Sequence, residues 1–335
     1  MDVTMHCVFT VVYVVIVMFK LVYVNSLSSN ITVLDMNAEN MTCINFDTLN
    51  QIKSLEEIRF TFGNMSYFPD KDCNNPEHEE DPRPLDLPNL RKIVLQFIEL
   101  KEVPNTSLMP KLEVFFLSIN SIKEIPGTPF RNNVNLRSIG FYDIDLTSVP
   151  NLTGGCNRLD KLNLNGNLIS NIPKEYFKGC SIKTSAMKNN KLTSFPNFAL
   201  LGNTIEEIKI DGNLISGMIT NDMVKDLPNL RLFYIYDNKL QGFDASFCNG
   251  HQPIQIKAYQ NIDLKIFENP YRLCIHLLET FITKPTIDLS STNIPCDHHR
   301  CWMKKYASKF TIQINDCTDG RVWGSVHEMD VCRQG

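Results

Sequence analysis

The chain has 335 residues, a formal net charge of −4 at neutral pH and 21% charged residues. Its acidic and basic residues are dispersed, and no stretch gathers lysine and arginine. Because nucleic-acid-binding surfaces need a strongly basic stripe, this pattern argues against a nucleic-acid partner.

The amino-terminal residues 1–26 have the features of a secretory signal peptide. An apolar run from Cys7 to Phe19 is followed by Lys20, and Val24 and Ser26 have the small-residue spacing that a signal peptidase recognises. A membrane anchor is the alternative, but the run is short for the roughly 20 residues that span a bilayer. We therefore expect cleavage near Ser26 and a secreted, extracellular mature chain without stable membrane insertion.

Cysteine usage and glycosylation sequons support an extracellular location. Of the 11 cysteines, Cys7 lies in the signal, so ten remain, an even number suited to five disulfides in an oxidising compartment. Asn-x-Ser/Thr sequons, which are candidate sites of N-glycosylation, occur at Asn30, Asn40, Asn64, Asn105 and Asn151.

Residues 27–54 are expected to form an amino-terminal cap segment. Cys43 and Cys73 are candidates for a bridge across the first coil of the array that follows. After Cys73, acidic residues and prolines lengthen the interval between the first two repeats to 35 residues. We expect a solvated surface loop here, with a partner-binding loop as the alternative.

Residues 55–283 carry an apolar pattern that fits neither a helix nor a strand. In LDKLNLNGNLISNIP, residues 159–173, leucine or isoleucine recurs at intervals of 3, 2, 5 and 3 residues. Copies begin at Leu55, Leu90, Leu112, Leu136, Leu159, Ile182, Ile205, Leu230 and Ile254, and a half-copy begins at Ile287. From Leu90 to Ile254 the starts are 22 to 25 residues apart, which indicates a solenoid.

Each copy predicts one coil. Alternate residues of a short strand point into a shared core, and an asparagine then turns the chain and satisfies backbone groups within the bend. The asparagines expected to stack from coil to coil are Asn120, Asn167, Asn190, Asn213 and Asn238. Where Ile98, Ile144 and Ile262 replace asparagine, we expect a less regular coil.

The pattern resembles the template of leucine-rich repeat proteins, L-x-x-L-x-L-x-x-N-x-L, which residues 159–169 match most fully. The resemblance implies an α/β fold, a leucine-rich repeat solenoid of about nine repeats with a curved parallel sheet on its concave face. Residues 284–335, the half-repeat and four cysteines, look like the cysteine-rich carboxyl-terminal cap of extracellular members. That cap implies the pairs Cys296–Cys317 and Cys301–Cys332, although the usual C-x-C is here Cys296-x4-Cys301.

Two further cysteines lie within the array. Cys156 and Cys180 each precede the first apolar residue of a repeat, on successive coils. Because neighbouring coils lie ~5 Å apart, a disulfide can join them; buried free thiols are the alternative. Cys248 and Cys274 are expected to be the remaining pair.

No catalytic pattern occurs in the chain. Asp297, His298, His299 and Cys301 are possible zinc ligands, but cap cysteines are expected to be oxidised, and adjacent histidines rarely reach one tetrahedral ion. Nucleophile motifs and glycine-rich phosphate loops are absent. We expect no enzyme activity, no metal and no cofactor.

The surface with functional potential is the concave face of the sheet. Residues between the core positions point outward there, among them Phe62, Val94 and Ile119. The predicted binding residues are Phe97, Val114, Phe116, Tyr142, Tyr234 and Tyr236, because exposed apolar groups and tyrosines are typical of contact surfaces. The alternative is that sugar, the acidic loop or irregular packing covers Phe97 and Phe116.

These features predict a secreted glycoprotein that binds another extracellular protein or other macromolecule. Fold does not choose between adhesion, receptor assembly and innate recognition. One alternative is a non-catalytic subunit of a secreted enzyme complex, because short chains of this kind resemble the non-catalytic subunit of luciferin monooxygenase. Another is a structural protein of the extracellular matrix, which the missing four-cysteine amino-terminal cap argues against.

Overall fold

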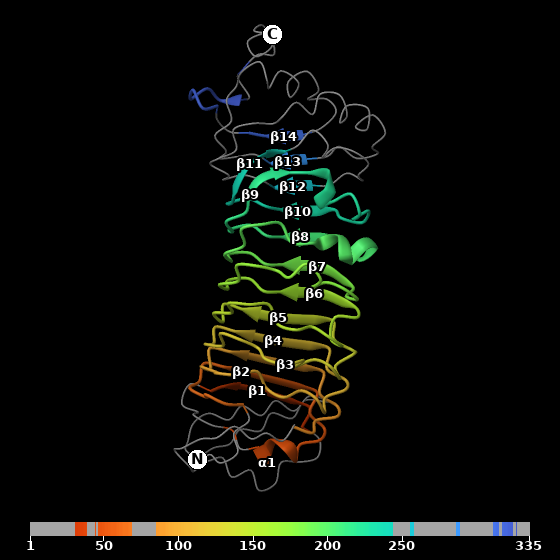
Figure 1. The fold of residues 1–335 in the computed structure, drawn as a ribbon. Coiled ribbons are helices and arrows are strands. Elements are labelled where there is room, and N and C mark those ends of the chain that lie inside the picture. Colours follow the sequence, from red (N-terminus) through yellow and green to blue (C-terminus); the bar gives the residue numbers. More distant parts are fainter. Residues whose placement is uncertain are drawn as a thin grey trace. The chain divides into compact units, whose positions relative to one another are not determined.

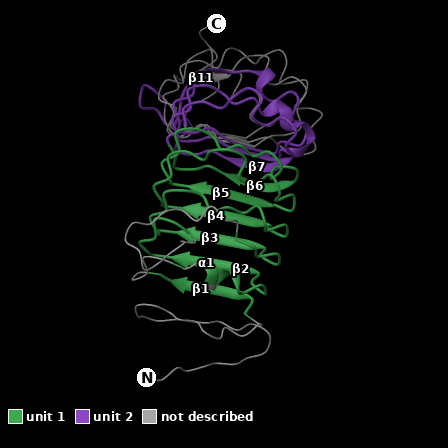
Figure 2. Cartoon of the chain, turned by 60° about the horizontal axis from the view of Figure 1, so that its bottom comes forward, with its two compact units in different colours: residues 1–167 green, residues 168–335 purple. Residues whose placement is uncertain are grey.

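The computed structural model describes residues 31–38, 44, 46–68, 85–243, 255–257, 286–288, 311–314, 317–323 and 326. The chain divides into two compact units, residues 1–167 and residues 168–335 (Figure 2). In both, short parallel strands follow one another through the sheet in chain order (Figure 1). This is the predicted parallel-sheet solenoid.

The first unit contains one strand from each coil. These strands are β1 (Val33–Asn37), β2 (Glu57–Thr61), β3 (Lys92–Gln96), β4 (Val114–Ser118), β5 (Ser138–Tyr142) and β6 (Leu159–Asn163). Adjacent strands are parallel and aligned, so that Ile58, Ile93 and Phe115 occupy equivalent positions. Helix α1 (Phe46–Asn50) lies between β1 and β2. The strand β1 extends the sheet into the segment expected to be a cap.

The second unit continues the same plan. Its strands in the sheet are β7 (Ile182–Ala186), β8 (Glu207–Lys209), β10 (Leu232–Tyr234), β12 (Gln255–Lys257), β13 (Thr286–Asp288) and β14 (Thr311–Gln313), and those after β7 have only three residues each. The 3-10 helices η1 (Phe198–Thr204) and η2 (Asn221–Met223) lie in connections. Strands β9 (Ser216–Ile219) and β11 (Lys239–Phe243) pair in a separate two-stranded parallel sheet.

The repeated apolar positions form the core. In the coil of β4, Leu112, Phe115 and Leu117 are completely buried. The equivalent positions of the other coils are buried and mostly apolar, with Ser185 of β7 as a buried polar exception. Phe115 also contacts the rings of Phe130 and Phe141, with centroid distances of 5.1 and 5.8 Å. Burial of each such side chain stabilises the stack by ~1.5–3 kcal/mol relative to exposure, so a coil gains stability from its neighbours.

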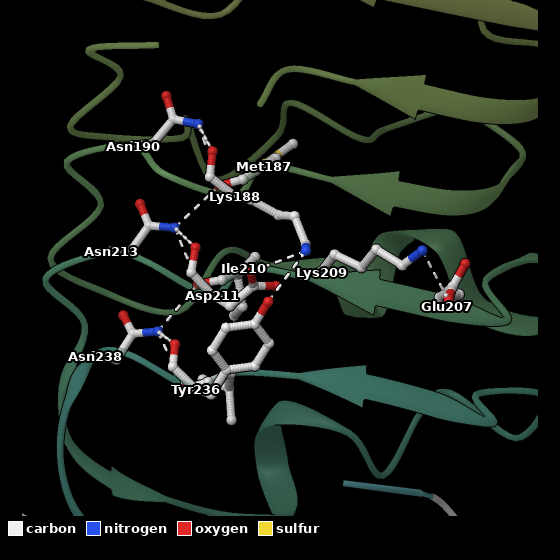
Figure 3. A network of polar contacts seen from close by, with 11 residues as sticks. Met187, Lys188, Asn190, Glu207, Lys209, Ile210, Asp211, Asn213, Tyr236 and Asn238 are labelled. Carbon is white, nitrogen blue, oxygen red and sulfur yellow. Dashed lines mark hydrogen bonds and ion pairs between the residues drawn. The ribbon is translucent and has the colours of Figure 1, made fainter. Parts of the chain in front are cut away.

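The predicted asparagine stack is confirmed. The Asn167 amide nitrogen donates to the carbonyl oxygen of Phe141 at 2.8 Å, and its side-chain oxygen accepts from the N–H groups of Ile144 and Leu146 at 3.2 and 3.1 Å. Each asparagine therefore joins its own bend to the backbone of the preceding coil. Buried asparagines with equivalent bonds are Asn120, Asn190, Asn213 and Asn238, the last three shown in Figure 3.

The coils that lack this asparagine differ in their turns. Ile98 and Ile144 are fully buried in the asparagine position, and the residues after them, Glu99 and Asp145, have positive φ angles of 62° and 65°. Within the described ranges, no residue directly after an asparagine of the stack is left-handed. The predicted irregularity is thus confirmed in the turns. The strands β3 and β5 each pair with β4 along five residues, whereas β5 pairs with β6 along three. Ile262 lies outside the described residues.

Two cysteine predictions can be compared with the structure. Cys156 and Cys180 are both disulfide-bonded, as the predicted bridge between them requires, so the free-thiol alternative is wrong. Cys317 of the predicted cap is also disulfide-bonded. The other predicted disulfide cysteines lie outside the described residues, namely Cys43, Cys73, Cys248, Cys274, Cys296, Cys301 and Cys332.

The signal segment and the Asp297–Cys301 cluster also lie outside the described residues. Within the described ranges, no group of three histidine, cysteine or acidic residues could hold a metal ion. The same ranges contain no helix of the length and apolar character that a bilayer crossing requires.

Candidate binding surface

Outward-facing residues form rows across the sheet of the first unit, because the strands are aligned one to one. The central row runs through Asp35, Arg59, Val94, Phe116 and Gly140. It begins with an ion pair between Arg59 and Asp35 at 3.6 Å and then becomes apolar. Val94 is buried within this row although its position faces outward, so its neighbours cover it. The apolar surface therefore adjoins a charged margin.

Phe116 packs against a glycine on the next strand. A Cβ atom at Gly140 would lie 2.2 Å from the Cδ2 atom of Phe116, so the ring lies directly over the glycine backbone. Any side chain at Gly140 would displace it. The ring remains partly exposed, as do the adjacent Val114 and Ile119. This contact packs the ring against the sheet and leaves it partly exposed.

A second row follows the ends of the strands, in the position just before the asparagine slot. Its residues have left-handed φ angles in every described coil from β2 to β10. They are Phe62, Phe97, Ile119, Asp143, Gly166, Asn189, Gly212 and Asp237. Glycine, asparagine and aspartate adopt this conformation most readily, whereas a bulky or β-branched residue is an outlier. Three successive coils of the first unit thus carry large apolar side chains in a strained conformation.

Phe62 and Phe97 stack on each other within this row. Their ring centroids lie 5.0 Å apart with an interplanar angle of 20°, and the side chains are 52% and 42% exposed. Tyr142, two coils beyond Phe97, is 38% exposed. We define the aromatic patch as Phe62, Phe97, Val114, Phe116, Ile119 and Tyr142.

In the second unit, the predicted tyrosines belong to a polar network (Figure 3). The Lys188 ammonium lies between Asp211, at 3.1 Å, and the hydroxyl oxygen of Tyr236, at 3.2 Å. It also lies 5.6 Å from the centroid of the Tyr236 ring. Because Asp211 is only 2% exposed, its carboxylate has lost most of its hydration. The ion pair with Lys188 offsets part of that cost.

Tyr234 has a similar lysine partner. The Lys209 ammonium lies 5.4 Å from the centroid of the Tyr234 ring and forms an ion pair of 3.0 Å with Glu207 on the same strand. A cation over an aromatic face is attracted by the negative charge of the ring face. Both tyrosines are partly exposed. The network therefore orients two rings at the sheet surface, and the lysines beside them carry acidic partners.

Comparison with known proteins identifies the fold. No protein-family model matches the chain, and no curated protein sequence matches it. Among solved structures, a chain of the octameric complex of Latrophilin 3, Unc5D and FLRT2, whose FLRT2 component is a leucine-rich repeat part, is similar with a TM-score of 0.58. The identity is 16%, and 91% of each chain is covered.

A leucine-rich repeat protein of Leptospira interrogans is similar with a TM-score of 0.53 and 17% identity, over 85% of this chain and 79% of that chain. The chain has the leucine-rich repeat fold. The L-x-x-L-x-L-x-x-N pattern of its sequence and the strand order of its sheets both belong to this leucine-rich repeat architecture.

Within the leucine-rich repeat sheet, all six predicted binding residues are partly or largely exposed. Phe97, Val114, Phe116 and Tyr142 lie on three successive coils of the first unit, and Tyr234 and Tyr236 lie on one coil of the second. Sequence reasoning missed the contact of Phe116 with Gly140 and the lysine partners of the tyrosines. The glycine in an outward strand position was a usable signal, since glycine within a strand often marks close approach of another group.

Proposed function

We propose that this chain is a secreted, glycosylated binding protein that recognises another extracellular protein through the exposed face of its leucine-rich repeat sheet. It acts without a cofactor and without enzyme activity of its own. The observation that carries the proposal is the set of fixed but exposed rings, in particular Phe116 held over Gly140. Rings that are oriented before binding lose little conformational entropy in a complex, which favours affinity.

The charge distribution supports a protein partner. The lysines next to the rings of Tyr236 and Tyr234 are Lys188 and Lys209, and they form ion pairs with Asp211 and Glu207. Their charges are therefore balanced locally, and the surface around the tyrosines is aromatic with little net charge. Aromatic anchors surrounded by polar groups are typical of protein-binding hot spots. The Latrophilin 3, Unc5D and FLRT2 assembly is a case in which a leucine-rich repeat part takes part in a complex of proteins.

Co-purification from the native secreted fluid tests the proposal. The tagged full chain is used as bait, the bound protein is identified by mass spectrometry, and its dissociation constant is then measured by titration. We expect the joint substitution of Tyr234→Ala and Tyr236→Ala to weaken binding at least tenfold, roughly 1.4 kcal/mol, because central rings dominate affinity. The melting temperature verifies that the variant is folded.

The matched control replaces Leu168 and Leu214 by alanine. Both are exposed apolar residues of the same unit, and each follows an asparagine of the stack and so lies off the strands. The control should bind as the unchanged protein does. Loss of binding in the control alone would place the site elsewhere. A stoichiometric catalytic chain would instead identify an enzyme subunit, and recovery only with insoluble material would identify a matrix protein.

A further inference from the structure

Phe97 stacks on one face of the Phe62 ring. The position aligned with Phe62 on the preceding coil is Ala38, whose side chain is a single methyl group. The Ala38 side chain is itself buried, while Phe62 is 52% exposed. The stacked pair therefore presents a flat aromatic surface to solvent at the end of β2.

The conformation of Phe62 is costly for any residue that has a Cβ atom. Its φ angle is 56°, and five of the eight positions in this row are glycine, asparagine or aspartate, Phe97 and Ile119 being the other exceptions. Phenylalanine gains nothing from this backbone geometry, so the ring needs another role. Strained residues of this kind are a reason to look for a binding partner of the side chain.

A glycosylation sequon begins two residues after this ring. Asn64, Met65 and Ser66 form the sequon, and the backbone around it is held by bonds from the Gly63 N–H to the Phe97 carbonyl oxygen and from the Met65 N–H to the Ile98 carbonyl oxygen, both 2.8 Å. Gly63 faces inward, because a Cβ there would lie 3.1 Å from the Ala38 Cβ. Phe62 and Asn64 are exposed on either side of it, and Met65 is buried.

We infer that the Phe62 ring is a stacking platform for the first N-acetylglucosamine of a glycan on Asn64, and that Phe97 supports the ring from the opposite face. The C–H bonds on one face of a pyranose ring are weakly positive and pack on the negative face of an aromatic ring. This assignment rests on the proposed secretion of the chain, because N-glycans are added along that route. It goes beyond the proposed binding function by giving the Phe62–Phe97 pair an occupant of its own.

The other two sequons within the described residues lack such a platform. Asn105 and Asn151 are also exposed, but each is preceded by Val-Pro. Their side-chain oxygens accept hydrogen bonds from the N–H groups of Ser107 and Thr153. They are therefore matched internal controls for sugar attachment without ring stacking.

The test uses the full chain produced in a eukaryotic secretory host, together with Phe62→Ala and Phe62→Tyr. Glycopeptide mass spectrometry measures occupancy at Asn64, Asn105 and Asn151, and NMR of the labelled glycans measures the sugar proton shifts. We expect Asn64 to be occupied, with upfield-shifted protons on its first sugar. The upfield shift should disappear in Phe62→Ala and persist in Phe62→Tyr, while the sugars on the other two asparagines do not change.

A stability cycle adds a second readout. Ser66→Ala removes the sequon without changing Asn64, and we expect it to lower the melting temperature by about 2–4 °C in the parent chain and by less than about 1 °C in Phe62→Ala. An unoccupied Asn64, or equal sugar shifts with and without the Phe62 ring, would overturn the inference. So would a loss of partner capture in Phe62→Ala together with unchanged sugar shifts, because the ring would then belong to the protein-binding site. Partner capture through Tyr234 and Tyr236 is measured separately, so failure of one proposal is distinct from failure of the other.

Discussion

At the scale of single residues, the turn after each strand requires a left-handed φ angle, and different coils place very different residues there. Gly166 meets the left-handed requirement with a φ of 68° and no Cβ, whereas Ile119 meets it with a φ of 51° and a β-branched side chain. A left-handed conformation costs a residue with a Cβ roughly 1–2 kcal/mol. The first unit therefore holds strain at positions where its surface is apolar.

This strain predicts opposite effects for two substitutions in the row. Ile119→Asn should raise the free energy of unfolding by about 1 kcal/mol, because asparagine tolerates the left-handed region better. Gly166→Ala should lower it by about 1 kcal/mol, because alanine brings a Cβ into the same conformation. Urea denaturation of each variant measures both effects. A stabilised alanine variant or a destabilised asparagine variant would show that side-chain packing outweighs backbone strain.

The buried asparagines are the other decisive residues. Asn167→Ala should reduce the free energy of unfolding by about 3 kcal/mol, because the N–H groups of Ile144 and Leu146 and the carbonyl oxygen of Phe141 lose a partner inside the stack. Asn171→Ala is the control, since Asn171 is exposed. Denaturant titration should give a change below about 0.5 kcal/mol for the control. Equal effects in both variants would contradict a structural role of the stack.

At the scale of elements, the strands of the second unit are short. The aligned segments of β8 and β10 have three residues each, and side chains add a link across them. Lys188, just after β7, reaches Asp211 in the next coil and Tyr236 in the coil after that. One side chain thus connects three coils on the exposed face of the sheet.

Removing the Lys188 link should lower the free energy of unfolding more than removing the ion pair of Lys209 with Glu207. Lys188→Ala should lower the free energy of unfolding by about 2 kcal/mol, because the buried Asp211 carboxylate loses its ion pair. Lys209→Ala should cost about 0.5 kcal/mol or less, since Glu207 is more exposed and keeps part of its hydration. Thermal and urea unfolding compare the two variants. A smaller loss for Lys188 than for Lys209 would mean that Asp211 finds other compensation.

At the scale of the whole molecule, each unit presents its own kind of exposed surface. The first unit presents an apolar aromatic patch, and the second presents tyrosines held by lysines. If the glycan on Asn64 occupies the Phe62–Phe97 pair, the partner surface of the first unit contracts to Phe116 and its neighbours. The proposed function then depends on Phe116, which packs over Gly140, and on Tyr234 and Tyr236, which lie beside lysines.

The predicted extracellular location also predicts the oxidation state of the cysteines. All ten cysteines outside the predicted signal peptide should be oxidised, because an odd or unpaired set would leave reactive thiols in an oxidising compartment. Thiol counting with an alkylating reagent under non-reducing denaturation should find no free thiol in the secreted protein. Two or more reactive thiols per chain would exclude at least one of the predicted bridges.

Much of the fold was determined by sequence spacing alone. Intervals of 3 and 2 residues place side chains such as Leu159, Leu162 and Leu164 on one face of a coil. Asn167 follows at the bend, where its side-chain amide bonds backbone N–H and C=O groups that have no backbone partner. These are local requirements that every coil repeats, so one chain provides many copies of the same evidence. The equivalent positions of Cys156 and Cys180 followed from the same repeat.

The details of the surface were decided by neighbours that are distant in sequence. Phe62 and Phe97 are 35 residues apart, Phe116 and Gly140 are 24 apart, and Lys188 and Tyr236 are 48 apart. These pairs meet only because parallel strands align coils of unequal length, and the insertion before β3 hides that alignment in the sequence. The sequence by itself determined which residues face the core and which face outward. Only the tertiary structure decided which outward rings stack on each other, which ring lies over a glycine and which rings lie beside a lysine. Those contacts depend on the register between coils.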